Sequence, residues 1–200
     1  MDDLELFKKQ WQSQDDLPSY KKDDLYLMMH EKSSSIVKWI FIISIIEFAF
    51  WIALELLTSS QETDEIIKKM SLNGFYRVSL IINYVVIIGF IVLFFLNYKA
   101  IKTTDSTRGL MKNILKTRRT VKAYVWFNIL FFSLSFIVSI VMTIKHYINF
   151  DTIQFWISIG ISIAVLLVIV LLFLLFYRVV YGVLTRRLKR NYNNLKQIEL

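Results

Sequence analysis

The 200-residue sequence contains no cysteine, one proline and five glycines. Without cysteine, disulfides, thiolate zinc sites and thiol nucleophiles are excluded together. Proline and glycine are the residues that most often interrupt helices, so their scarcity permits long uninterrupted helices. Five scattered glycines also cannot build a glycine-rich phosphate-binding loop. These shortages remove several classes of enzyme and favour a helical protein.

Apolar residues are abundant, because hydrophobic residues make up 56% of the chain, against about 45–50% in soluble domains. A membrane-spanning helix needs about 20 mostly apolar residues. Four runs meet this length, at residues 36–57, 78–98, 123–144 and 153–177. Only a helix satisfies every backbone polar group within such a segment. The sequence therefore predicts an all-α fold, an integral membrane four-helix bundle with short cytoplasmic N- and C-terminal helices.

The distribution of basic residues predicts the orientation of these spans. Twenty Lys and Arg lie on one side: before and just inside the first span, between the second and third spans, and after the fourth span. The two loops on the other side carry four. Positive residues concentrate on the cytoplasmic side, so we expect both termini to be cytoplasmic. The chain then divides into a cytoplasmic tail (1–35), a four-span domain (36–181) and a cytoplasmic C-terminal amphipathic helix (182–200).

Glu47 lies near the middle of the first span, where an ionisable group is costly and faces the bundle interior or is neutral. One interpretation is a relay for protons or cations, and the other is a hydrogen-bonded Glu satisfied by Asn83, Asn128 or a serine of a neighbouring helix. Glu55, two turns later, is expected to reach the outer membrane interface. The first interpretation would suit a small transport or channel component.

The N-terminal tail reads as two short helices joined at Pro18, the second ending before Ser33. Its apolar side chains are candidates for binding a protein partner: Leu4, Phe7, Trp11, Leu25 and Met28. In the first outer loop, the capping-box spacing of Ser59 and Glu62 predicts another short helix. Aromatic residues near the span ends, among them Trp39, Trp126, Tyr124 and Tyr177, are typical of the belts at membrane interfaces.

Two further segments are amphipathic. Residues 106–122 carry an apolar stripe with cations around it, which suits either a helix on the inner membrane face that attracts anionic lipid or cations that only set the topology. Nucleic-acid binding has charge as its sole support and is not favoured. The C-terminal segment has an a/d heptad stripe, which predicts either a homodimer seam or packing on the tail or membrane. The candidate seam residues are Leu184, Leu188, Asn191 and Leu195.

The inventory of reactive residues argues against an enzyme. The only histidines, His30 and His146, are expected on opposite sides of the membrane, so they cannot share a metal ion. Inside the apolar runs the only acids are Glu47 and Glu55. We therefore expect no catalytic site, no metal and no cofactor.

Three stretches resemble a family of small four-span membrane proteins from Flavobacterium-like Bacteroidetes. They are the N-terminal 3–12, the middle segment 110–122 with Tyr124 and Phe127-Asn128, and the C-terminal 181–196, where the family's acidic residue is replaced by Asn194. The resemblance implies a bacterial inner-membrane location but no known activity. Members often lie beside genes for extracytoplasmic-function sigma factors, which implies a regulator. A carotenoid-oxygenase label carried by some members does not fit, because such enzymes hold iron with four histidines.

Taken together, these patterns lead to a non-enzymatic membrane-bound regulator or scaffold that binds a cytoplasmic protein partner, such as a sigma factor, through its tails. The alternative is an ion- or proton-coupled transport component that uses Glu47.

Overall fold

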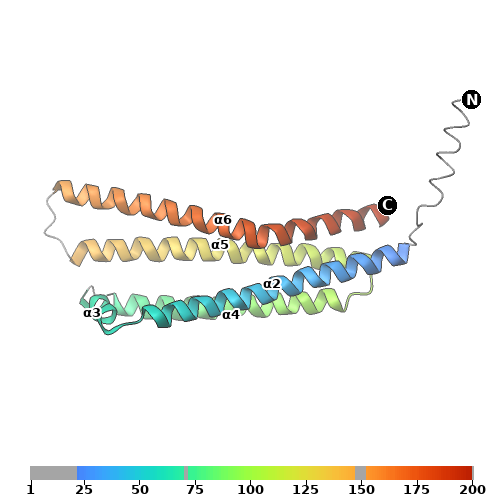
Figure 1. The fold of residues 1–200 in the computed structure, drawn as a ribbon, viewed down its shortest axis with the longest axis horizontal. Coiled ribbons are helices and arrows are strands. Elements are labelled where there is room, and N and C mark those ends of the chain that lie inside the picture. The colour runs from blue at the N-terminus through green and yellow to red at the C-terminus, as the bar shows by residue number, and fades with distance from the viewer. Residues whose placement is uncertain (1–21, 70–71, 147–151, 200) are drawn as a thin grey trace, which may run out of the picture.

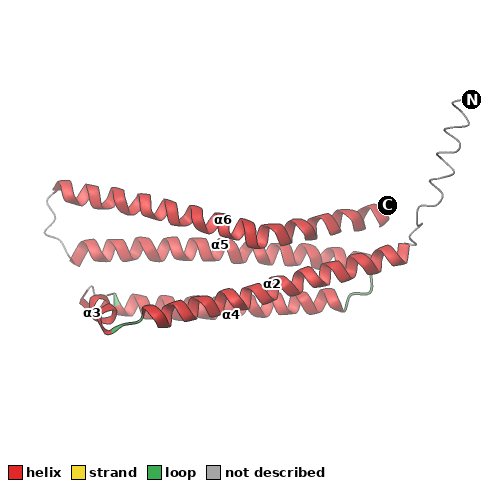
Figure 2. Cartoon of the chain, in the orientation of Figure 1, coloured by secondary structure: helices red, strands yellow, loops and turns green. Residues whose placement is uncertain are grey.

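The computed structural model describes residues 22–69, 72–146 and 152–199. These residues form five helices: α2 (Lys22–Thr58), α3 (Gln61–Lys69), α4 (Asn73–Lys102), α5 (Thr107–His146) and α6 (Thr152–Glu199) (Figure 1). Within the described ranges no strand is present, and short turns join the helices (Figure 2). The all-α prediction is confirmed. The expected first tail helix and its joint at Pro18 lie outside the described residues.

Four of these helices, α2, α4, α5 and α6, are long and apolar enough to span a membrane. Each contains one of the four predicted spans. Large apolar side chains such as Ile46, Leu130 and Leu167 point outward and are about 60% exposed, an arrangement that contiguous helices in water would not tolerate. These features indicate a membrane protein.

The four long helices form a ring with up-down-up-down connectivity. Helix α2 packs against α4 and α6, and α5 packs against the same two helices, so consecutive helices are antiparallel neighbours. Figure 1 shows that α3 lies at one end of the bundle and the C-terminus at the other. We call these two parts the α3 half and the tail half. The tail half holds α2 up to Glu47, the α4–α5 turn and α6 from Tyr177 onward.

Helix α2 is longer than the sequence suggested, and the predicted break before Ser33 is wrong. The helix continues through the three serines into the first span. Ser33 has no exposed surface, and its hydroxyl accepts a hydrogen bond from Asn191 Nδ2 of α6 at 3.1 Å. Tertiary contact overrides the weak helix propensity of serine. The predicted outer-loop helix is confirmed as α3.

Residues 107–122 do not form a separate helix on a membrane surface. They are the first turns of α5, which continues without a break into the third span. Leu110 and Ile114 have no exposed surface, and Val121 is 3% exposed. The apolar stripe of this segment therefore packs inside the bundle, so the interpretation as an interfacial helix is wrong. The C-terminal amphipathic segment likewise continues the fourth span as part of α6.

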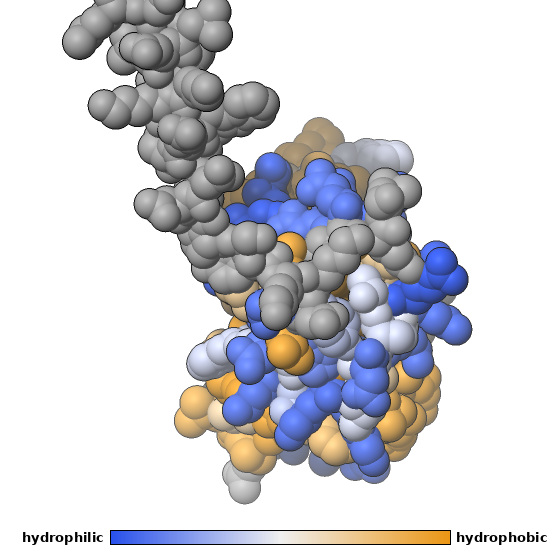
Figure 3. Space-filling model, turned by 90° about the vertical axis from the view of Figure 1, so that its right-hand side faces the viewer, coloured by the Kyte–Doolittle hydropathy of each residue, from blue (hydrophilic) through white to orange (hydrophobic). Residues whose placement is uncertain are grey.

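The packed core lies mainly in the tail half. Its buried apolar cluster includes Val37, Ile40, Phe94, Ile101, Leu110, Ile114, Val121, Tyr124, Ile129, Tyr177, Tyr181, Leu188 and Leu195. Two other buried apolar residues, Leu72 and Ile87, lie in the α3 half outside this cluster. Figure 3 views the molecule from the tail end, where hydrophilic side chains gather. The tail half thus combines a tight interior with a polar end surface.

Hydrogen bonds between helices reinforce the tail half. The Tyr26 hydroxyl donates to the Thr104 carbonyl at 2.7 Å, and a ring nitrogen of His30 lies 2.8 Å from the Ile101 carbonyl oxygen. On the neighbouring helix pair, Asn97 Nδ2 donates to the Thr120 hydroxyl at 3.0 Å. These bonds join α2 to α4 and its following turn, and α4 to α5. Together with the core they fix the spacing of the helices at this end.

Candidate functional site

The carboxyl group of Glu47 is bound by two tyrosines of α6. Glu47 is only 7% exposed. The Tyr177 hydroxyl donates to Glu47 Oε1 at 2.8 Å, and the Tyr181 hydroxyl donates to Oε2 at 2.9 Å. Residues four apart lie on the same face of a helix, so α6 presents both hydroxyls to α2 at once. Each carboxyl oxygen therefore has its own donor.

Tyr124 of α5 completes this group. Its ring centroid lies 6.2 Å from that of Tyr177 and 5.7 Å from that of Tyr181, both edge to face. Its hydroxyl also interacts with the Glu47 carboxyl group. We call Glu47, Tyr124, Tyr177 and Tyr181 the Glu47 cluster. Edge-to-face aromatic packing adds to the energy of burial, so the cluster joins three helices through one buried polar centre.

The Glu47 cluster brings one carboxyl group and three phenols together. These groups can share hydrogen bonds and exchange protons. Among the described residues there is no group of three or more His, Cys, Asp or Glu that could hold a metal ion. A carboxyl group in this setting is neutralised or hydrogen-bonded, and the tyrosines supply the hydrogen bonds.

Asn83 and Asn128 were predicted as partners of Glu47, and this part of the prediction is wrong. Asn128 Nδ2 donates to the Tyr124 carbonyl at 2.8 Å, one turn earlier in the same helix. Asn83 Oδ1 is buried and has no hydrogen-bond partner. Both side chains instead line a cavity beside the cluster. The structure thus brings the three residues to one region without bringing them into contact.

The sequence contained a signal for the true partners of Glu47. Tyr177 and Tyr181 lie four residues apart on one stripe and carry hydroxyl donors, which a buried carboxyl group needs. We assigned Tyr124 and Tyr177 to the aromatic belts, but they are 1% and 5% exposed and face the bundle interior. Trp39 and Trp126, by contrast, are about half exposed, as belt residues are.

A cavity of about 510 Å³ lies in the α3 half and is lined by residues of α2, α3, α4, α5 and α6. Its lining includes Tyr177, which belongs to the core and also donates to Glu47. Aromatic and aliphatic side chains make up most of the wall. Polar groups enter it from Thr58, Ser79, Ser135 and Ser139, along with the two asparagines. The cavity therefore reaches from the α3 end to the Glu47 cluster.

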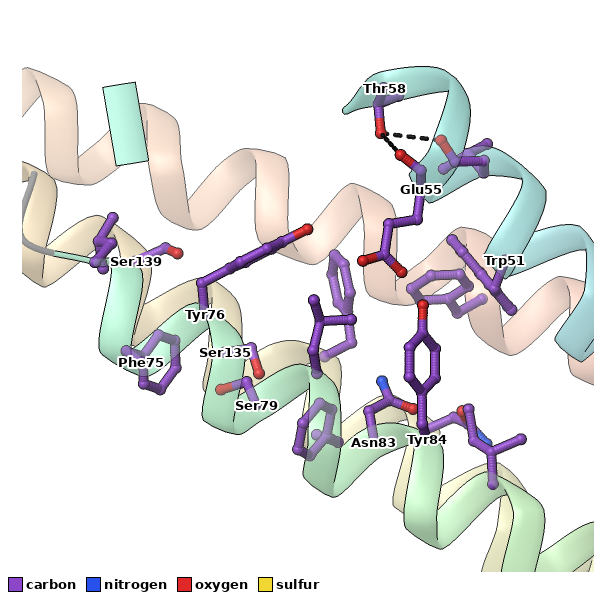
Figure 4. Close-up of a pocket in the computed structure, with 18 of the residues that line it drawn as sticks. Trp51, Glu55, Thr58, Phe75, Tyr76, Ser79, Asn83, Tyr84, Ser135 and Ser139 are labelled. Carbon is purple, nitrogen blue, oxygen red and sulfur yellow. Dashed lines mark hydrogen bonds between the residues drawn. The ribbon is translucent and has the colours of Figure 1, made fainter. Parts of the chain in front are cut away.

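Glu55 supplies the only carboxylate among the described lining residues of this cavity. Figure 4 shows its side chain pointing from α2 into the cavity, with the hydroxyl ends of Tyr76 and Tyr84 turned toward the same space. Tyr76 interacts with the Glu55 carboxylate. Glu55 is half-buried and lines the cavity, and its reach to the membrane interface stays a prediction.

A second, smaller groove of about 350 Å³ runs between α5 and α6 in the tail half. Arg118, Lys122 and Arg178 line it, together with Trp126 and Tyr181. The described residues that line it include no acid, so the groove has the charge that phosphate groups favour. Attraction of this groove to anionic lipid stays a prediction.

The C-terminal heptad stripe packs against other helices of the same chain. Leu188 and Leu195 have no exposed surface, and Asn191, at 5% exposure, donates to Ser33. Leu184 is half-buried. A homodimer stays a prediction, but a seam through these residues would first have to break their contacts with α2.

Only two of the five candidate partner-binding residues, Leu25 and Met28, lie in the part of the chain that the structure describes. Leu4, Phe7 and Trp11 lie outside the described residues. Leu25 is half-buried at the start of α2, whereas Leu27 and Met28 are 57% and 39% exposed. Two apolar side chains near the start of α2 are therefore exposed at the tail end of the bundle.

Comparison with known sequences links the whole described bundle to one family. The family described as Domain of unknown function (DUF8845) matches residues 23–200. The chain belongs to this family. No curated protein and no solved structure matches it. The DUF8845 description names no activity, so the function of this member has to be argued from its geometry.

Proposed function

We propose that the protein is a non-enzymatic regulator in the bacterial inner membrane that binds a cytoplasmic protein partner at the tail end of its bundle. The observation that carries the proposal is the continuity of α2, α5 and α6. Each helix runs without interruption from the cavity of the α3 half into the tail half. We expect a change in helix spacing at the cavity to shift the tail end as well, because a continuous helix can move as a rigid body.

Orientation follows from charge. Among the described residues, the tail half carries 17 of the 21 Lys and Arg, which favours the cytoplasmic side for this end. Because the chain has no native cysteine, single cysteines introduced at exposed positions report the side directly. We expect Glu65→Cys on α3 to react with a membrane-impermeant maleimide in intact spheroplasts, and Lys189→Cys on α6 to react only after lysis. The reverse pattern would invert the topology and refute the cytoplasmic partner.

The partner surface that we propose combines Leu27 and Met28 of α2 with the apolar residues of the preceding tail. Leu27 and Met28 lie exposed beside the half-buried Leu25. Exposed apolar side chains that are rimmed by polar residues mark protein interaction sites. The resemblance to proteins encoded near sigma factors suggests a sigma factor as the partner.

Affinity capture from mild detergent tests this surface. The bait is the full chain, compared with a chain that lacks residues 1–21 and with Leu27→Asp/Met28→Asp. The deletion stops before α2, so it leaves the described bundle intact. Asn193→Asp, on the exposed side of α6, is the matched control. We expect one cytoplasmic protein to be captured by the wild type and the control and lost from both altered baits. Capture that is equal from all four baits would reject the surface.

A second candidate function is proton- or cation-coupled transport through Glu47. The specific observation that favours it is Tyr177, which lines the cavity and donates to Glu47. The carboxyl group is therefore one side chain away from the cavity. We would compare cation-driven and proton-driven flux in proteoliposomes that contain wild type or Glu47→Gln. Flux that disappears in Glu47→Gln supports transport, whereas no flux, or equal flux in both, rejects it.

A further inference from the structure

The wall of the α3-half cavity has a distinctive composition. Of the 20 described residues that line it, eight are aromatic: Trp51, Phe75, Tyr76, Tyr84, Phe131, Phe132, Phe173 and Tyr177. One is the carboxylate Glu55, and none of these 20 is Lys, Arg or His. Aromatic faces attract cations through their quadrupole. The described wall therefore combines one negative charge, several negative ring faces and no compensating cation.

The hydrogen-bonding capacity of the wall is also biased in one direction. Asn83 Oδ1 is buried and accepts no hydrogen bond from any described residue. Because buried acceptors are almost always paired, an unpaired oxygen here indicates room for a donor from a bound molecule. Glu55 adds two further acceptor oxygens from the neighbouring helix, α2. A ligand that donates hydrogen bonds would satisfy these acceptors.

The dimensions suit a small organic molecule. The cavity volume of about 510 Å³ falls within the range of about 300–1,000 Å³ that is typical of ligand pockets. The two acceptors lie on α2 and α4, and the phenylalanines of α5 and α6 form the facing wall. The α5 and α6 side adds these phenylalanines together with the polar side chains of Asn128, Ser135 and Ser139.

We propose that this cavity binds an amphipathic organic cation, with an ammonium group between Glu55 and Asn83 and an apolar body against the aromatic wall. The ammonium group would donate to the Glu55 carboxylate and to Asn83 Oδ1, and the hydroxyl groups of Tyr76 and Tyr84 would lie beside it. A carboxylate or phosphate in the same place would meet Glu55 without a balancing cation. The proposal does not depend on whether the protein regulates a partner or transports an ion.

The test uses wild-type protein in nanodiscs and three probes of similar shape, namely 4-phenylbutylammonium, 4-phenylbutanol and 4-phenylbutanoate. Isothermal titration calorimetry with empty nanodiscs as the reference measures binding beyond partition into lipid. We expect the ammonium probe to bind at least about tenfold more tightly than the alcohol, and the carboxylate not to bind. Equal affinity for all three probes would show a pocket for apolar chains, such as a lipid acyl chain, and would overturn the proposal.

Variants locate the site. Glu55→Gln keeps the shape and removes the charge, so it should weaken binding of the ammonium probe about tenfold. Glu65→Gln, at an exposed position on α3, is the matched control and should bind like wild type. Ser135→Phe should fill the cavity and abolish binding of both the ammonium and the alcohol. Unchanged binding in Glu55→Gln and Ser135→Phe would place the probe elsewhere and reject the site, while leaving the partner-binding proposal untouched.

Discussion

Removing the Tyr181 hydroxyl tests whether the Glu47 cluster holds the bundle together. Tyr181→Phe keeps the ring, which is 1% exposed, and deletes only the donor that lies 2.9 Å from Glu47 Oε2. A net hydrogen bond contributes about 0.5–1.5 kcal/mol, and a buried group left without a partner costs about 1–3 kcal/mol. Measured couplings in a membrane protein average about 0.6 kcal/mol and reach about 1.7. We therefore expect a loss of about 1 kcal/mol in the free energy of unfolding.

A double-mutant cycle isolates this interaction from other effects of the substitution. In a Glu47→Leu background the Tyr181 hydroxyl has lost its acceptor, so Tyr181→Phe should cost almost nothing or should stabilise the fold. The assay is unfolding in mixed micelles at increasing mole fraction of SDS, followed by far-ultraviolet circular dichroism. The coupling energy should be about 1 kcal/mol. A coupling below about 0.3 kcal/mol, within the usual error of additivity, would refute the idea that this bond links α2 to α6.

Tyr192→Phe serves as the matched control for that cycle. Tyr192 lies on the same helix and packs against the core, but it is 11 residues further along, which is about 16 Å at 1.5 Å per residue. It should show no coupling to Glu47→Leu. Coupling of equal size at both tyrosines would mean that Glu47→Leu disturbs α6 as a whole.

Three further predictions use the same unfolding assay. Asn191→Leu removes the donor to buried Ser33 and should cost about 1–3 kcal/mol, most of which Ser33→Ala should restore in the double variant. Gly109→Ala should lower the free energy of unfolding by about 1–3 kcal/mol, because the new Cβ would lie 2.8 Å from side-chain atoms of the α4–α5 turn. Its control is Gly89→Ala, which should be neutral or stabilising because the space around that Cβ is open. Leu188→Lys should unfold the tail half of each monomer, because Leu188 has no exposed surface and a buried unpaired charge is costly. If the substitution only separates a dimer into stably folded monomers, this prediction is wrong.

Much of the fold could be predicted from the sequence, because membrane spans and apolar stripes are local properties. Each of the four apolar runs lies in one long helix, and the short outer-loop helix is present. The boundaries outside the spans were less successful. Ser33 and its neighbours suggested a helix end, since serine has weak helix propensity. The contact between Ser33 and Asn191, 158 residues apart in sequence, keeps them helical, and no local pattern contains that information.

The candidate site was predicted only in part, for a related reason. Composition and position identified Glu47 as a buried ionisable group that needs partners. The spacing of Tyr177 and Tyr181, four residues apart, places them on one helix face. Nothing in either pattern states which helix that face meets. The ring order of the helices decides that α6 lies beside α2, and this order gives Glu47 its tyrosine donors in place of Asn83 and Asn128. The cavity escaped prediction because it is formed by five helices together.

The length of α6 has a mechanical consequence. Its apolar part, residues 153–177, is about 37 Å long and already exceeds the roughly 30 Å of a bilayer's hydrocarbon. The 22 residues that follow Tyr177, up to Glu199, add about 33 Å more. Because Asn191 binds Ser33 of α2, this part of α6 and the start of α2 would move together as one lever arm. A tilt of about 5° at its base displaces its tip by about 3 Å. A small adjustment around Tyr177 would thus become a movement large enough to make or break the fit of a docked protein, and a fluorophore attached at the tip would report it.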